Sequence, residues 1–148
     1  MSGQISSLRV RVRKEYLPFY KDLLKRKIFK EHNEFFTFCC TVGRDLFEKE
    51  NKLSLVELCQ AYTFSEYQKT VLKCLAYEKT KQILDGKELF LKAEQLADLG
   101  FTYLIENVLK DFVLINEQGE VSLNPGKEMD VQLALSRFVS QKFVTVPF

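Results

Sequence analysis

The chain has 148 residues, of which 46% are hydrophobic and 28% are charged, and its net charge is +2. A chain of this length and composition can bury a core as one domain, which excludes a disordered or fibrous protein. No run of about 18 apolar residues is present, and arginines stand where a signal peptide would need an apolar stretch. We therefore expect a cytoplasmic protein that does not cross a membrane.

The first thirty residues are strongly basic. They hold nine Lys or Arg and two acids, a balance of +7, whereas the remaining residues hold 13 basic and 18 acidic groups, a balance of −5. Small polar residues at 1–7 predict a disordered tail on a single globular domain that spans 1–148. After the tail, LRVRVR at 8–13 alternates apolar residues with arginines, which predicts a short edge strand with all three arginines on one face.

A helix is predicted over 14–29, because its apolar residues recur near the helical period. Its polar face continues the basic strand, which makes a candidate nucleic-acid-binding surface of Arg9, Arg11, Arg13, Lys14, Lys21, Lys25 and Arg26. Such cations attract phosphates and release counterions, which gives affinity without sequence preference. The alternative is that these charges only keep the domain soluble or pair with its acidic body. On either view, replacing the three arginines with glutamine is expected to leave folding nearly intact.

A largely buried helix is predicted over 33–50, with Asn33 as its N-cap and an early end near Gly43. Ser54 is followed three residues later by Glu, a capping-box pattern that predicts a short helix over 54–62.

Three more helices and a hairpin complete the prediction. Ser65 begins a helix that runs to about residue 81, and the strongest helical pattern covers 87–111, with Gly100 as a point of interruption. Alternation at 112–124 predicts a β-hairpin. An amphipathic helix follows it, with an apolar face of Met129, Leu133, Leu135, Phe138 and Val139. The expected fold is mainly α (α+β), a compact helical domain with a short N-terminal strand and a C-terminal β-hairpin.

Two other binding functions fit the second half of the chain. The apolar side chains Phe143, Val144, Val146 and Phe148 need burial, which favours a homodimer or a partner protein that docks there. Helices followed by a hairpin are also typical of a winged-helix regulator. The predicted hairpin tip carries Glu117 and Glu120, however, and carboxylates there would repel a phosphate backbone.

Residue types that carry catalysis are sparse. The single histidine, His32, lies in a polar run and is predicted to be solvated or next to a helix cap. No cysteine pair has C-x-x-C spacing, so the four are predicted to be buried, unreactive thiols: Cys39, Cys40, Cys59 and Cys74. Cys39 stands among phenylalanines, which would raise its pKa and excludes a Cys–His dyad. Without a nucleotide loop or a metal motif, the chain is predicted to be no enzyme and to use no cofactor or metal.

The stretch IFKEHNEFFTFCCTVG at 28–43 follows the basic strand and helix, and AEQLADLGFTYLIENVL at 93–109 follows later. Both resemble a small protein family found with bacterial DNA phosphorothioation and restriction (Dnd) gene clusters. Ala93, Glu94, Ala97 and Gly100 carry the second part of this resemblance. The resemblance implies a setting in bacterial or phage-linked DNA defence, and it implies no reaction.

Overall fold

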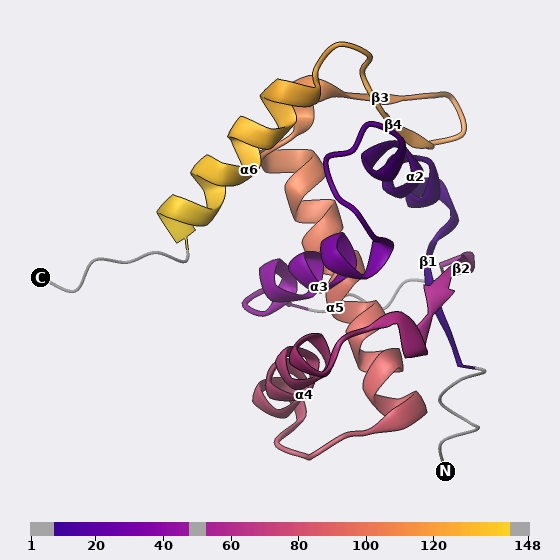
Figure 1. Ribbon diagram of the computed structural model, residues 1–148, viewed down its shortest axis with the longest axis vertical. Coiled ribbons are helices and arrows are strands. Elements are labelled where there is room, and N and C mark those ends of the chain that lie inside the picture. Colours follow the sequence, from indigo (N-terminus) through magenta and orange to yellow (C-terminus); the bar gives the residue numbers. More distant parts are fainter. Residues whose placement is uncertain (1–7, 48–52, 143–148) are drawn as a thin grey trace, which may run out of the picture.

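A computed structural model gives the fold of residues 8–47 and 53–142, and the first and last residues of the chain lie outside this description. Helices dominate, and two short antiparallel sheets of two strands each accompany them (Figure 1). The elements, with η for a 3-10 helix, are β1 (Arg9–Arg13), η1 (Lys14–Tyr16), α2 (Leu17–Lys25), α3 (His32–Gly43), β2 (Leu55–Gln60), η2 (Ala61–Thr63), α4 (Glu66–Thr80), α5 (Gly86–Asn107), η3 (Lys110–Phe112), β3 (Val113–Ile115), β4 (Val121–Leu123) and α6 (Glu128–Lys142). The mainly α class with an N-terminal strand and a C-terminal hairpin is confirmed.

The strand at the N-terminus forms as predicted, but its partner was predicted wrongly as a helix. β1 pairs in antiparallel fashion with β2, which occupies most of the 54–62 segment. Val12 lies opposite Val56. A hydrogen bond from the Lys14 N–H to the Ser54 carbonyl, at 2.8 Å, extends the pairing just beyond the two strands. The capping-box pattern was misleading, because pairing with an otherwise unpartnered strand outweighs a weak local helix preference.

Helix α2 ends four residues earlier than predicted, at Lys25. Lys27 adopts the left-handed conformation, with φ of 61°. The N–H of Ile28 then bonds to the Leu23 carbonyl at 2.9 Å and that of Lys27 to the Leu24 carbonyl at 3.0 Å, which is a Schellman C-cap. Glycine usually marks this position, so a lysine there gives the sequence no stop signal.

Helix α3 begins at His32 rather than after Asn33. Glu31 is the N-cap, and its side chain forms a reciprocal capping box with Glu34. Asn33 is buried and serves tertiary structure instead, since its amide donates to the Thr63 carbonyl at 3.0 Å and accepts from Gln68 at 2.9 Å. The assignment of Asn33 as N-cap was therefore wrong, because its polar groups link α3 to α4.

Helices α3 and α5 cross at two glycines, and this is the most extensive contact in the fold. A Cβ built on Gly43 would lie 2.1 Å from the Leu96 carbonyl oxygen, and one on Gly100 would lie 1.8 Å from the Cys39 carbonyl oxygen. α3 does end at Gly43, as predicted. Gly100 does not interrupt α5, which runs continuously past it to Asn107.

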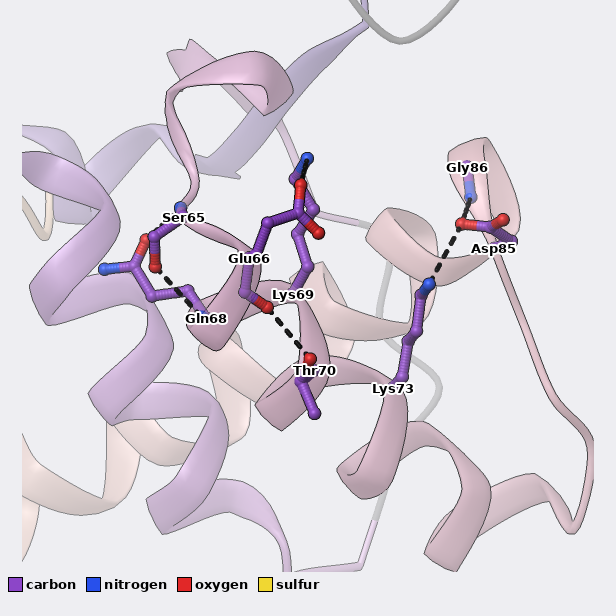
Figure 2. Close-up of polar contacts among 8 residues, drawn as sticks. All are labelled: Ser65, Glu66, Gln68, Lys69, Thr70, Lys73, Asp85 and Gly86. Carbon is purple, nitrogen blue, oxygen red and sulfur yellow. Dashed lines mark hydrogen bonds and ion pairs between the residues drawn. The ribbon is translucent and has the colours of Figure 1, made fainter. Parts of the chain in front are cut away.

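Helices α4 and α5 both begin with side-chain caps. Ser65 Oγ accepts from the Gln68 N–H at 3.1 Å, while the Ser65 N–H donates to Gln68 Oε1 at 2.9 Å (Figure 2). Asp85 accepts the Gly86 N–H at 2.9 Å and meets Lys73 of α4 at 3.8 Å. The predicted starts at Ser65 and after residue 85 are confirmed.

The core between these elements is aromatic. Phe101 of α5 lies within 4.0 to 5.9 Å, centroid to centroid, of four rings: Tyr16, Phe19, Tyr20 and Phe35. These rings come from η1, α2 and α3, so the N-terminal basic segment is anchored to the centre of the fold. Aromatic pairs of this kind contribute about 0.5–1.5 kcal/mol beyond their buried area.

Helix α6 lies on one side of this core and buries few side chains, chiefly Val131 and Leu135 (Figure 1). Met129 and Leu133 were predicted on its apolar face, yet 66% and 48% of their surface is exposed. No helix in the described ranges has both the length and the apolar composition needed to cross a bilayer.

Candidate nucleic-acid interface

Strand β1 presents its arginines as predicted, because Val10 and Val12 point into the core and Arg9, Arg11 and Arg13 point the other way. Each guanidinium meets a carboxylate from another element. Arg9 pairs with Glu57 of β2, and the other two pair with residues of α5. The strand's positive charge is thus neutralised within the fold. This agrees with the alternative that the basic residues pair with the acidic body of the domain.

The Arg13–Asp98 pair is the best formed. Arg13 Nε donates to Asp98 Oδ1 at 2.9 Å and a terminal nitrogen donates to Oδ2 at 2.5 Å, while the guanidinium lies 4.5 Å from the Tyr16 ring centroid. Burial alone would lower the pKa of Arg13, but the hydrogen bond and the charge of Asp98 hold that pKa above its usual value. Only 23% of the Arg13 side chain and 15% of the Asp98 side chain is exposed. Arg13 therefore has a structural role, in which it joins β1 to α5 through Asp98.

Arg11 is held differently, through its backbone. Its N–H donates to Glu94 Oε2 at 2.7 Å, and its guanidinium lies 3.5 Å from Glu94 Oε1. Burial raises the pKa of Glu94, and the Arg11 N–H and guanidinium oppose that rise. Glu94 thereby covers a donor on the outer edge of β1 that no neighbouring strand satisfies.

The lysines of the basic front, the name we give to residues 9–30, are exposed, as are Arg9, Arg11 and Arg26. The lysines differ from these arginines in their ion pairs. Within the described residues, none of the following takes part in an ion pair: Lys14, Lys21, Lys25, Lys27 and Lys30. Lys21 and Lys25 are one turn apart on α2 and so share a face. Arg26, also predicted in the site, pairs instead with Glu128 of α6 at 2.9 Å.

The sequence prediction missed Lys27 and Lys30 as members of this surface. Both follow α2 in the same basic run of the sequence. The high share of lysine and arginine in that run could have identified them. We use the name lysine surface for Lys14, Lys21, Lys25, Lys27 and Lys30. Burial and the positive charge of Lys21 lower the pKa of His32, the first residue of α3.

The hairpin packs against α2, and its tip carries the acids Glu117 and Glu120. Asp22 Oδ2 accepts the Leu123 N–H at 2.9 Å, which fixes β4 to α2. At the tip, Asn116 Oδ1 accepts the Gln118 and Glu120 N–H groups at 3.0 and 2.9 Å. Each strand has three residues, and Glu117 lies in the exposed tip. The wing of a winged-helix protein would need cations at this tip.

Two of the four cysteines match the predicted buried state and two do not. Cys39 and Cys40 are fully buried, and burial raises the pKa of both thiols. Cys59 is half-buried, and burial raises its pKa to about 11. Cys74 is exposed on α4, so the prediction of four buried thiols was wrong. The prediction treated every cysteine as a small hydrophobic residue, but Leu72 and Leu75 occupy the buried face of α4 and Cys74 does not lie on it.

We expect native protein to react quickly with a thiol reagent at Cys74 alone. Cys59 should follow slowly, because little of it is in the thiolate form at pH 7. Cys39 and Cys40 should react only after denaturation. Mass mapping of the labelled residues during a time course measures this, with Cys74→Ser as the control that removes the fast phase. Fast native labelling of Cys39 would contradict the buried core described above.

In the described part of the chain, no cluster of three His, Cys, Asp or Glu side chains could hold a metal ion. Comparison of the chain with protein-family models, with curated proteins and with solved structures gives no match.

Proposed function

We propose that this protein is a non-enzymatic accessory protein of a bacterial or phage-linked DNA modification, restriction or mobile-element system, and that it contacts nucleic acid through the lysine surface. The resemblance of residues 28–43 and 93–109 supports the setting. The charge pattern supports the contact. Because the contact is with phosphates, it confers no sequence preference.

The division between paired arginines and unpaired lysines carries this proposal. An arginine held by a carboxylate must give up that partner before it binds a phosphate, whereas an exposed ammonium only releases water and counterions. Lys25 and Lys27 also complement the negative end of the α2 dipole. This stabilises the helix and would explain these two lysines without any ligand. That explanation does not extend to Lys14 or Lys21, which lie away from this end.

The proposal is tested by an anisotropy titration of fluorescent duplex and single-stranded DNA at several salt concentrations. Wild-type protein should bind at ~50 mM salt, with affinity that falls steeply as salt rises. Replacing Lys21, Lys25, Lys27 and Lys30 with glutamine should weaken binding to all sequences. The salt slope should become shallower by about 0.9 for each of these lysines that contacts a duplex phosphate. Absence of binding by wild-type protein at ~50 mM salt would end the proposal.

The second candidate is a protein-interaction module, a homodimer or an adaptor, that docks through Phe143, Val144, Val146 and Phe148. These residues lie outside the described part of the chain. The exposure of Met129 and Leu133 on the preceding helix favours this candidate, because α6 offers further apolar surface to a partner. The winged-helix alternative is supported less, since the short hairpin presents carboxylates.

A further inference from the structure

A groove lies between β1 and the first half of α5, on the opposite side of β1 from its partner strand. Its volume is about 390 Å³, and it is lined by Leu8, Arg9, Arg11, Lys87, Phe90, Leu91 and Glu94. Lys87, Leu91 and Glu94 recur at helical spacing along one face of α5. This groove is distinct from the lysine surface, because it shares none of that surface's residues.

The floor and rim of the groove differ in chemistry. Leu8, Phe90 and Leu91 make an apolar floor, and Leu91 is 40% exposed there. Three cations stand around it, of which Arg9 is already paired with Glu57. Lys87 has no ion-pair partner among the described residues. The Arg11 guanidinium has five N–H donors and only a single 3.5 Å contact, to Glu94. A ligand that fits both parts must be apolar along one side and anionic along the other.

The backbone of β1 adds donors and acceptors to this groove. The Leu8 carbonyl accepts the Ala61 N–H at 2.9 Å, so Leu8 faces β2. Backbone groups alternate in direction along a strand, and those of Arg9 therefore face away from β2, toward the groove. Glu94 already occupies the next outward N–H, that of Arg11. An extended peptide is the ligand class that pairs with such an edge while placing alternate side chains on a floor and a rim.

We propose that this groove binds a short extended segment of a partner protein in which acidic residues alternate with apolar ones. The apolar side chains contact Phe90 and Leu91, and the carboxylates face Lys87 and the Arg11 guanidinium. A fluorescein-labelled peptide, acetyl-Glu-Leu-Glu-Val-Glu-Leu-amide, serves as the probe. It should bind full-length protein at least about tenfold more tightly than the same peptide with lysine in place of glutamate, because the charge of the rim excludes the basic form.

Substitutions on the exposed side of the groove locate the binding. Lys87→Glu combined with Leu91→Ser should weaken the acidic peptide about tenfold or more, since it removes one rim cation and part of the floor. Lys110→Glu makes the same charge change on η3, away from the groove, and should leave peptide affinity within about twofold. The lysine-surface variants should also bind the peptide normally, which keeps this test separate from that of the proposed function.

Three results would overturn the proposal. They are absence of binding by the acidic peptide, equal binding of the basic peptide, and insensitivity to the Lys87 and Leu91 changes in a variant that retains its circular dichroism spectrum. Loss of DNA binding in that same variant, with peptide affinity unchanged, would assign the groove to nucleic acid instead.

Discussion

Gly100→Ala is expected to destabilise the protein by about 3 kcal/mol, at the upper end of the effects of overpacking. The new Cβ would lie 1.8 Å from the Cys39 carbonyl oxygen and 2.9 Å from the Gly43 nitrogen. These are backbone atoms of α3, so relief requires the two helices to separate along their whole contact. Alanine's better helix propensity returns only about 1 kcal/mol, which does not offset the overlap.

Urea denaturation followed by circular dichroism measures this change. Gly126→Ala is the matched control, because Gly126 also has a special conformation, with φ of 85°, but no atom lies within 4 Å of its Cβ position. It should cost about 1 kcal/mol, from backbone strain alone. If Gly100→Ala is no more destabilising than Gly126→Ala, the close crossing of α3 and α5 is wrong.

Arg13→Gln is expected to destabilise the protein by about 2 kcal/mol, because it leaves the Asp98 carboxylate largely buried without its partner. The expectation from the sequence, that glutamine leaves folding nearly intact, is therefore withdrawn for Arg13 and kept for the exposed Arg9. Its side chain is 60% exposed, and Arg9→Gln should change stability by less than about 0.5 kcal/mol.

A double-mutant cycle on Arg13 and Asp98 separates the pair from its surroundings. Asp98→Asn should rescue part of the loss caused by Arg13→Gln, since the amide removes the unpaired charge. The free energies of unfolding come from urea titrations at pH 7. Additive effects of the two substitutions, or a loss at Arg13 no larger than that at Arg9, would show that the pair does not stabilise the fold.

The sequence predicts most of this fold because its helices have strong local signals. The Ser65 cap and the apolar periodicity after residue 85 each depend only on residues within a few turns of the same helix. The 54–62 segment could not be predicted in the same way, because its strand conformation depends on β1, more than forty residues away. The Lys27 C-cap also has no sequence marker, since its hydrogen bonds come from the backbone.

The sequence predicts which basic residues form the candidate site, but not which of them have acidic partners. Alternation in β1 correctly placed three arginines on one face, but their partners Glu94 and Asp98 lie far along the chain on α5. Only the tertiary structure brings these groups together. Among the described residues the lysines of 14–30 have no ion-pair partners, so the surface proposed to bind nucleic acid moves from the strand to α2 and the turn that follows it.

One comparison tests most directly whether the lysines, and not the arginines of β1, contact nucleic acid. Lys21→Gln with Lys25→Gln, and Arg9→Gln with Arg11→Gln, remove the same charge from the two halves of the basic front. Duplex DNA affinity, measured by anisotropy at ~50 mM salt, should fall about tenfold or more for the lysine pair and less than about threefold for the arginine pair. Equal losses, or a larger loss for the arginine pair, would contradict the claim that the unpaired lysines make the contact.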